Sequence, residues 1–201
     1  MNEPARRLTP GAELQSYEGT IERILFDRAE IAEAIERLGR QIARDYAGQP
    51  LLLLGVLKGA LYVAADLARA ISRSPGGPSH LEMDFLVVSS YGNSTRSSGE
   101  VRMLKDTSEN IGGKNVLIVE DIVDNGLTLS YLQALLSGRN PAGLRSCVLF
   151  DKPYRRRVDV PIEYVGLVAP DEFVVGYGLD YQEKYRNLPY LAQLRSWVFS
   201  E

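Results

Sequence analysis

The stretch VLIVEDIVDNGLTL, residues 116–129, joins an apolar run to a cluster of carboxylates and a glycine, namely Glu120, Asp121, Asp124 and Gly126. The apolar run is typical of a buried strand. Like charges packed this closely repel one another, so the cluster is costly unless a cation or a polyhydroxyl ligand shares the site. The stretch therefore predicts a strand with a ligand site where the strand ends.

The rest of the sequence alternates between helical and strand patterns. Residues 28–46 place apolar side chains along one face of a helix, and Asp27 can cap its start. Because the strand patterns are apolar throughout, they indicate strands buried on both faces. The sequence therefore predicts an α/β fold with a mostly parallel twisted sheet flanked by helices. Further helices are expected over 60–71 and 127–137, and strands over 51–56, 81–92 (running into a loop), 100–104, 116–119, 144–150 and 162–168.

The composition is that of an ordinary globular protein, with 45% hydrophobic and 24% charged residues in a chain of 201, which suits one domain. The formal net charge of −3 gives no general attraction to nucleic acid or to an anionic membrane, so neither is an expected partner. Cys147 is the single cysteine, which excludes an internal disulfide. The sequence has no apolar span of about 18 residues and no signal-peptide pattern, so we expect a cytoplasmic protein.

The expected helix that follows the carboxylates suggests how an anion binds beside them. Ligands of such sheets bind beyond the carboxyl ends of the strands, and the free N–H groups at a helix start attract phosphate. Gly126 lets the backbone approach closely, so a phosphate is expected against residues 125–128. The carboxylates are then left for sugar hydroxyls or a divalent metal. An alternative reading makes Asp124 a helix N-cap, but it does not explain three carboxylates at once.

The same residues carry a resemblance to a known family. VLIVEDIVDNGLTL resembles the phosphoribosyl-diphosphate (PRPP) signature of the type I phosphoribosyltransferases and, in its Glu-Asp form, that of the hypoxanthine-guanine phosphoribosyltransferases. LLGVLKGALYVAADLAR resembles the family's diphosphate loop with the following helix, and DFLVVSSYG its mobile-loop entry. VLFDKP and YVGLVAPDEFVVGYGLDYQEKYRNLPY resemble its purine-binding segment and C-terminal region, so the resemblance spans about residues 51–190. It implies a single type I phosphoribosyltransferase domain over 1–201, with a core of about 28–170 and a small purine-binding hood formed by the N-terminus and about 171–201.

The resemblance assigns the first stretch to PRPP. It implies that Glu120 and Asp121 hold the ribose 2- and 3-hydroxyls, directly or through Mg²⁺, and that the loop after them wraps the 5-phosphate. Asp124 would be the catalytic base that accepts the proton lost from N7 of the purine. This sequence has Asn125 where the family usually has Thr or Ser, and Asn can donate to phosphate through its side-chain amide in place of the hydroxyl. The implied PRPP ribose and 5-phosphate residues are Glu120, Asp121, Asp124, Asn125, Gly126, Leu127 and Thr128.

The resemblance also implies diphosphate, metal and purine contacts. Lys58 would follow a non-proline cis peptide, and Lys152 would donate to the 6-oxo group of the base, a preference that disfavours adenine. Phe173 would stack on the base. Read alone, Lys58 is a solvated charge, Phe173 is core and Ser90–Tyr91 is a surface turn. The implied diphosphate residues are Lys58, Gly59, Ser90, Tyr91 and Arg186, the purine residues Lys152, Phe173, Val174 and Asp180, and the metal residues Glu120, Asp121 and Asp180, with residues 89–106 closing over the site.

The activity implied by the resemblance is purine salvage, in which PRPP and a 6-oxopurine base give the nucleoside 5-monophosphate and diphosphate with Mg²⁺ as cofactor. Two alternatives stay open: a PRPP- or nucleotide-sensing regulator on the same fold that binds RNA or DNA, and a transferase that prefers xanthine. The resemblance also implies a homodimer or homotetramer. The basic run Arg155 to Arg157 is expected to be a solvated turn, although one of its members could help a phosphate or a subunit contact.

Overall fold

The computed structural model describes residue 17, residues 19–90 and residues 101–200. Two sheets and four α-helices make up this part of the chain. The elements in chain order are β1 (Ile21–Phe26), α1 (Arg28–Asp45), β2 (Pro50–Leu57), α2 (Leu61–Arg73), β3 (His80–Ser90), β4 (Val101–Lys105), β5 (Asn115–Val123), α3 (Leu127–Ser137), β6 (Gly143–Asp151), the 3-10 helix η2 (Pro153–Arg155), β7 (Tyr164–Val168), β8 (Val174–Val175), β9 (Leu191–Leu194) and α4 (Ser196–Phe199).

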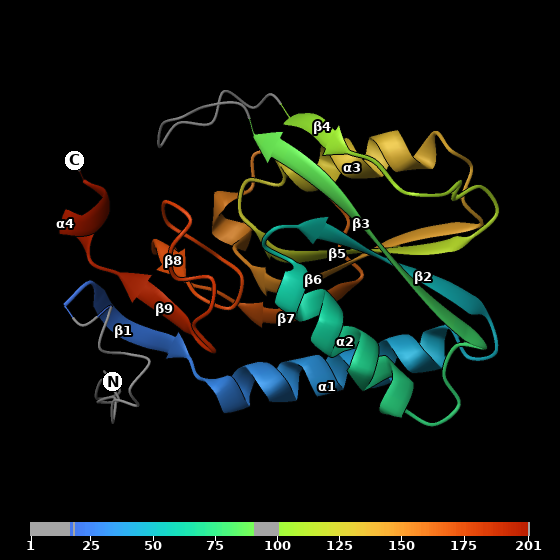
Figure 1. Cartoon of the computed structure of the whole chain (residues 1–201), viewed down its shortest axis with the longest axis horizontal. Helices are drawn as coiled ribbons and strands as arrows, with labels where there is room; N and C mark the ends of the chain where they lie inside the picture. The colour runs from blue at the N-terminus through green and yellow to red at the C-terminus, as the bar shows by residue number, and fades with distance from the viewer. Residues whose placement is uncertain (1–16, 18, 91–100, 201) are drawn as a thin grey trace.

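The larger sheet has six strands in the order β4-β3-β2-β5-β6-β7 (Figure 1). All neighbouring pairs are parallel except β3 and β4, which are antiparallel at the edge. The prediction of a mostly parallel sheet flanked by helices is therefore confirmed. The carboxyl ends of β2, β5 and β6 meet along one edge of this sheet, which is where a ligand site is expected.

Helices cover both faces of the larger sheet, and the sequence pattern explains how. Alternate residues of β2 point to opposite faces, so Leu51 and Leu53 pack with α1 and α2 while Leu52 and Leu54 pack with α3. All four leucines are buried. A strand enclosed in this way has no polar face, which accounts for the unbroken apolar runs in the sequence. The predicted start of α1 is confirmed, because Asp27 accepts hydrogen bonds from the amides of Ala29 and Glu30.

The smaller sheet has three antiparallel strands in the order β1-β9-β8, and it lies beside the carboxyl edge of the larger sheet (Figure 1). Neither β1 nor β9 is among the strands expected from the sequence. The smaller sheet has its own apolar cluster, which includes Val175, Leu188 and Ala192. The segments between β8 and β9 are thereby brought next to the end of β5. In the described part of the chain, no helix is both long and apolar enough to cross a membrane.

Candidate active site

Two of the three predicted carboxylates, Glu120 and Asp121, lie near the carboxyl end of strand β5. Glu120 is buried, and that burial, together with the neighbouring Asp121, raises the pKa of its carboxyl group well above the usual range. Burial also raises the pKa of Asp121 to about 6, although the amide of Ile122 donates to its Oδ1 at 2.8 Å and Arg186 acts in the opposite direction. Both groups are therefore costly to ionise in the free protein, as expected of acids that meet a cation or hydroxyl donors.

The loop between β5 and α3 turns at Gly126, whose φ of 84° lies in the left-handed region. A side chain there would also meet Val158 and Val160 at 3.1–3.3 Å. The Oδ1 atom of Asn125 accepts a hydrogen bond from the amide of Leu127 at 2.9 Å, so Asn125 helps to begin the helix. The alternative that Asp124 caps α3 is wrong, because its carboxylate instead lies 3.4 Å from Nη1 of Arg155.

A second segment approaches the carboxylates from β2. The Leu57–Lys58 peptide is cis, which confirms the expectation made from the resemblance. The added Cβ of an alanine at Gly59 would lie 1.9 Å from Oδ2 of Asp121, so only a glycine fits against that carboxylate as it stands. Nζ of Lys58 pairs with Oε2 of Glu183 at 2.9 Å, and both side chains are about two-thirds exposed.

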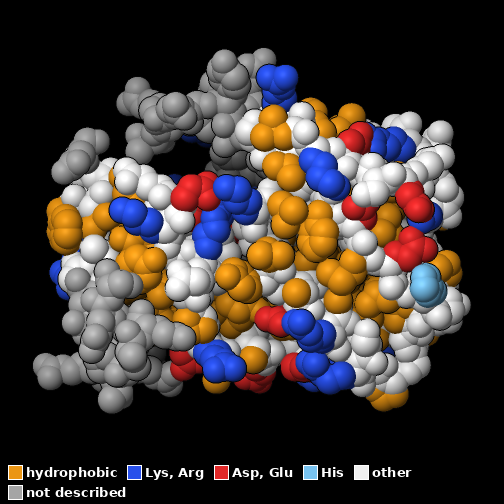
Figure 2. Space-filling model, in the orientation of Figure 1, with side chains coloured by type: hydrophobic (Ala, Val, Ile, Leu, Met, Phe, Trp, Pro, Cys, Tyr) orange, Lys and Arg blue, Asp and Glu red, His pale blue; other side chains and the backbone are white. Residues whose placement is uncertain are grey.

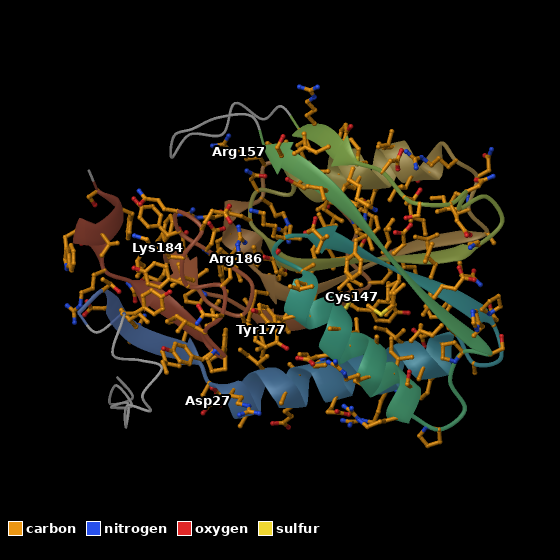
Figure 3. All side chains as sticks on the ribbon, in the orientation of Figure 1. Asp27, Cys147, Arg157, Tyr177, Lys184 and Arg186 are labelled. Atoms are coloured by element: carbon orange, nitrogen blue, oxygen red, sulfur yellow. The ribbon has the colours of Figure 1, made fainter. Side chains whose placement is uncertain are left out.

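The segment after β8 completes the opposite side. At Gly178 an added Cβ would lie 2.0 Å from the carbonyl oxygen of Gly59, so the two backbones touch. Arg186 donates from Nη1 to the carbonyl of Gly178 at 2.8 Å, and its Nη2 pairs with Oδ1 of Asp180 at 2.7 Å. The Nε atom of Arg186 is buried and has no hydrogen-bond partner among the described residues. Arg186 lies between the two sheets (Figure 3).

These parts line one cleft of about 310 Å³. The predicted residues that the structure brings together there are Gly59, Glu120, Asp121, Thr128, Asp180 and Arg186. Three carboxylates with an arginine and a helix start can bind hydroxyls, a cation and an anion side by side. Among the described residues, no group of three or more acidic, histidine or cysteine side chains could hold a metal by protein ligands alone. The carboxylates in the cleft nevertheless fit Mg²⁺, because this ion binds through one or two carboxylates and completes its shell with substrate oxygens and water.

Of the predicted purine residues, Asp180 lines this cleft, whereas Lys152, Phe173 and Val174 do not. Lys152 follows β6 and is buried, and its Nζ donates to the carbonyl of Glu172 at 2.5 Å. Burial lowers the pKa of Lys152, while Asp124 favours its charged form. Phe173 stacks on Phe199 at 4.5 Å between ring centroids, and Val174 is buried in β8. Phe173 is thus partly buried against the apolar cluster of the smaller sheet, in line with the prediction of a core residue made without the resemblance.

Part of the predicted site is not described. Tyr91 lies outside the described residues, as does the side chain of Ser90 and most of the segment 89–106 expected to close over the site. Their predicted roles stay predictions.

The contacts of one arginine differ from the prediction. Arg156 was expected in a solvated turn, and this is wrong, because its side chain is 19% exposed and pairs with Asp151. Its Nη1 also donates to the carbonyls of Val123 and Asp124, at 2.9 and 2.6 Å. No local pattern signals these contacts, since their acceptors lie at the end of the neighbouring strand. Arg155 is exposed, as expected of a solvated turn, and it pairs with Asp124 and Asp171.

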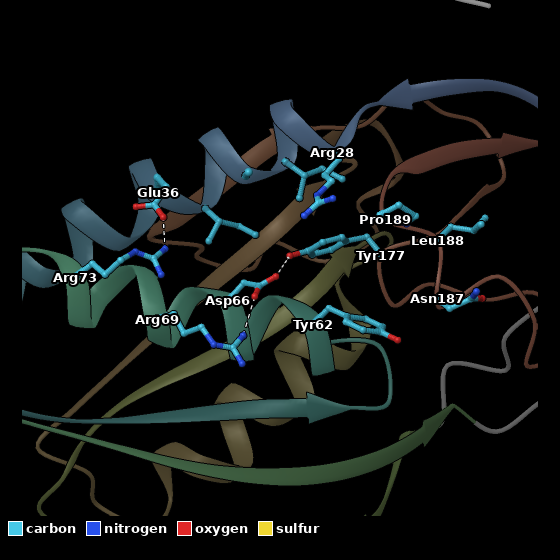
Figure 4. Close-up of a pocket in the computed structure, with 13 residues that line it drawn as sticks. Arg28, Glu36, Tyr62, Asp66, Arg69, Arg73, Tyr177, Asn187, Leu188 and Pro189 are labelled. Atoms are coloured by element: carbon cyan, nitrogen blue, oxygen red, sulfur yellow. Dashed lines mark hydrogen bonds and ion pairs between the residues drawn. The ribbon is translucent and has the colours of Figure 1, made fainter. Parts of the chain in front are cut away.

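A second cavity, of about 400 Å³, lies between α1, α2 and residues 187–189 (Figure 4). Its charged groups largely satisfy one another: Asp66 accepts from the hydroxyl of Tyr177 at 2.6 Å and pairs with Arg69 at 3.0 Å, and Arg73 pairs with Glu36. None of the predicted site residues lines it. Of these two cavities, the predicted site residues therefore line only the smaller one, at the carboxyl edge of the sheet.

Comparison with known proteins shows the family to which the chain belongs. A family model described as the phosphoribosyl transferase domain matches residues 23–182, so the chain belongs to the phosphoribosyltransferase family. It is 48% identical over 198 residues to the hypoxanthine-guanine phosphoribosyltransferase of Mycobacterium tuberculosis, which covers 96% of this chain and 95% of that protein. It is 46% identical over 187 residues to the bifunctional protein TilS/HprT of Listeria monocytogenes, of which it spans only 28%. A solved hypoxanthine phosphoribosyltransferase from Staphylococcus aureus superposes with a TM-score of 0.84 at 42% identity, covering 92% of this chain and 98% of that one, which confirms the type I fold.

Proposed function

We propose that this protein is a purine salvage enzyme. It transfers the 5-phosphoribosyl group from PRPP to N9 of hypoxanthine or guanine and gives IMP or GMP plus diphosphate. The observation that carries the proposal is the cleft in which Glu120 and Asp121 lie beside the start of α3. The similarity to hypoxanthine-guanine phosphoribosyltransferases supports it. One ligand satisfies both halves of this cleft, because PRPP offers hydroxyls to the acids and a phosphate to the helix start.

In the β5–α3 segment, the end of β5 binds the ribose and the loop with the start of α3 binds the 5-phosphate. Glu120 and Asp121 accept hydrogen bonds from the 2- and 3-hydroxyls or bind Mg²⁺ there, since hydroxyls donate well to carboxylates. The phosphate takes the amides of residues 125–128 and the hydroxyl of Thr128, which also lines the cleft. Leu127 can contact the phosphate only through its backbone amide, and that amide also donates a hydrogen bond to Oδ1 of Asn125.

Asp124 is the proposed catalytic base. As N9 of the purine bonds to the anomeric carbon, the bond from that carbon to the diphosphate breaks, and the proton on N7 passes to the carboxylate. Asp124 is suited to this because its carboxylate is partly exposed and, among the described residues, pairs only with Arg155, at a long 3.4 Å. General-base help of this kind contributes about 10²- to 10⁴-fold to a rate.

The proposed diphosphate contacts lie on the opposite side of the cleft, and the proposed magnesium contacts come from both sides. Lys58, the amide of Gly59 and Arg186 bind the leaving diphosphate, and the unpartnered Nε of Arg186 supports this role. Asp180 lines the cleft together with Glu120 and Asp121, which supports metal binding by these acids. When bound, Mg²⁺ neutralises charge on the leaving group. Ser90 and Tyr91 are further proposed contacts, and residues 89–106 are proposed to close over the site and exclude water.

The purine is proposed to stack on Phe173, with Val174 meeting its edge through backbone groups and Asp180 close by. Lys152 donates to the 6-oxo group. One of its three ammonium hydrogens is engaged by Glu172, so others stay available for the base. Adenine presents a donor at the same position and is rejected for that reason.

The decisive experiment measures diphosphate release with PRPP, Mg²⁺ and each base in turn. We expect turnover with hypoxanthine and guanine and little with adenine. Asp124→Asn should lower kcat by about 10²- to 10⁴-fold, whereas Asp159→Asn, which changes an exposed carboxylate, should keep it. Faster turnover of xanthine would favour the xanthine transferase. Silence with every base would favour the regulator, which the net charge of −3 disfavours.

We also propose a cytoplasmic homodimer or homotetramer in which the smaller sheet, with the N-terminus and residues 171–201, forms a hood over the purine. Leu61 and Tyr62, at the start of α2, are 46% and 38% exposed, which suits a subunit contact next to the diphosphate loop. Apolar side chains gather across the middle of this face (Figure 2). Sedimentation equilibrium of Leu61→Glu against the original chain tests the contact, with dissociation as the expected result. An unchanged mass would exclude this surface.

A further inference from the structure

Three consecutive backbone carbonyls, from the last residue of β5 into the loop after it, accept hydrogen bonds from one neighbouring segment. The Nη1 atom of Arg156 donates to the carbonyl of Val123 at 2.9 Å and to that of Asp124 at 2.6 Å. The amide of Arg157 donates to the carbonyl of Asn125 at 3.0 Å, and the amide of Lys152 adds a second bond to Val123 at 3.0 Å. The segment 152–157 thus turns the carbonyls of residues 123–125 toward itself.

We call these hydrogen bonds from residues 152–157 the brace. Because the peptide bond is planar, the brace also orients the amides on the other side of the loop. In a trans peptide the N–H group points opposite to the carbonyl of the same unit. When the carbonyls of residues 123–125 face the 152–157 segment, the amides of residues 124–126 face away from it. In the described part of the chain, the amides of Asn125 and Gly126 make no hydrogen bond. Successive free amides of this kind form a concave anion site.

Arg156 is itself fixed in place. Its Nη2 pairs with Oδ1 of Asp151, and the two side chains are only 19% and 14% exposed. Asp151 is the ladder partner of Val123 at the ends of β6 and β5, so the pair sits directly beside the strand that carries the loop. Hydrogen bonds from a guanidinium are stronger than neutral ones, and the planar fork reaches a carboxylate and carbonyls together.

We infer that Arg156 is a positioning residue for the 5-phosphate: it binds the carbonyls of Val123 and Asp124 and thereby aims the amides behind them at the phosphate without touching it. The inference rests on the proposed function, because it takes the loop as the phosphate site. Arg157 is its natural contrast. It is exposed and, in the described part of the chain, joins the brace through its backbone amide, which any residue would supply (Figure 3).

The test compares two ligands that differ only in the phosphate, IMP and inosine, on the full chain. Dissociation constants are measured for the original protein, for Arg156→Met and for Arg157→Met as the matched control. We expect Arg156→Met to lower the preference for IMP over inosine by about tenfold, the equivalent of about 1.4 kcal/mol. Arg157→Met should keep the preference within about twofold. General structural damage would weaken both ligands alike and leave the preference unchanged.

A second variant guards against misfolding of the first. Arg156→Lys keeps the charge beside Asp151 but loses the planar fork, so we expect a smaller drop in the preference, of about threefold. An unchanged preference in Arg156→Met, or in Arg156→Lys if the methionine variant does not fold, would overturn the inference. An original protein that binds IMP no better than inosine would instead overturn the phosphate site itself, and the inference with it.

Discussion

The two walls of the cleft are built in different ways. The β5 wall is continuous in sequence: its acids end a buried strand, and its loop is braced by hydrogen bonds from Arg156 and the amide of Arg157. The opposite wall joins Gly59 to residues 178–186 and relies on backbones that touch where no side chain fits. Its charged groups pair at the rim, as Lys58 does with Glu183.

This difference separates two kinds of cost. The β5 wall carries an electrostatic cost, because Glu120 is buried, Asp121 is half-buried and the pKa values of both are raised. The opposite wall carries a steric requirement, because the approach of Gly59 to Asp121 leaves no room for a Cβ. A change in the first wall should therefore act on stability and protonation, whereas a change in the second should act on geometry.

The largest effect is expected from a substitution that disturbs the close backbone approach in the opposite wall. In Gly59→Ala the new methyl group displaces the Asp121 carboxylate, since its Cβ would lie 1.9 Å from Oδ2 and 2.5 Å from Cγ. We expect kcat/KM for PRPP to fall by about 10²-fold, because a displacement of about 1 Å in a reacting site costs that much.

The control for this variant is Gly138→Ala. Gly138 ends α3 with a φ of −63°, and the nearest atom to an added Cβ is the carbonyl oxygen of Leu135 at 3.5 Å. Its kcat/KM should match that of the original chain. Steady-state kinetics of both variants decide the matter, and full activity of Gly59→Ala would show that the close approach is not needed.

The same contrast explains which parts of the molecule the sequence could predict. The strand and helix around residues 116–129 carry local signals, namely an apolar run and then a glycine, and β5 and α3 are found there. The start of α1 was predicted for the same reason, because Asp27 lies next to the amides that it caps. From the residues alone, the carboxylate cluster and the helix start gave the β5 half of the cleft.

The opposite wall and the brace have no such local signal. Gly178 and Gly59 meet only because the chain returns past β8, and the approach is invisible in either segment alone. In the smaller sheet, Ile21 pairs with Leu194, near the two ends of the described chain, in strands of four to six residues. Arg156 was misread because its acceptors lie on a neighbouring strand. The resemblance to a family supplied Asp180 and Arg186, which pattern alone did not.

A smaller effect should show the electrostatic cost of the β5 wall. An unfolded aspartate titrates near 3.8, whereas the pKa of Asp121 in the folded protein is about 6. Between these values the folded state binds more protons than the unfolded one, so this group's contribution to stability is favourable at low pH and is lost as the pH rises through that window. Asp121→Asn removes the charge and should raise the free energy of unfolding at pH 7 by about 1 to 3 kcal/mol.

Urea unfolding of metal-free protein at pH 4 to 7 measures this effect. The difference between Asp121→Asn and the original chain should grow as the pH rises, and the difference matters more than either curve, since Asp84 and Asp106 have lowered pKa values with the opposite dependence. Asp159→Asn, at an exposed carboxylate, should show no such growth. A variant less stable than the original chain at pH 7 would contradict the electrostatic account of this wall.

The smallest effect concerns the ion pair at the rim of the opposite wall. Lys58 and Glu183 pair at 2.9 Å with side chains 64% and 65% exposed, and such pairs hold little free energy because water and salt screen them. Glu183→Gln should therefore change the KM for PRPP by less than about twofold in about 0.1 M salt, and the change should vanish near 1 M, where the screening length is about 3 Å. Glu22→Gln, which removes a similarly exposed partner of Arg195, is the control away from the cleft. A large change in KM that persists at high salt would mean that the Lys58–Glu183 pair fixes the geometry of the opposite wall. That wall would then depend on a charge pair as well as on close backbone packing, and the contrast between the two walls would not hold.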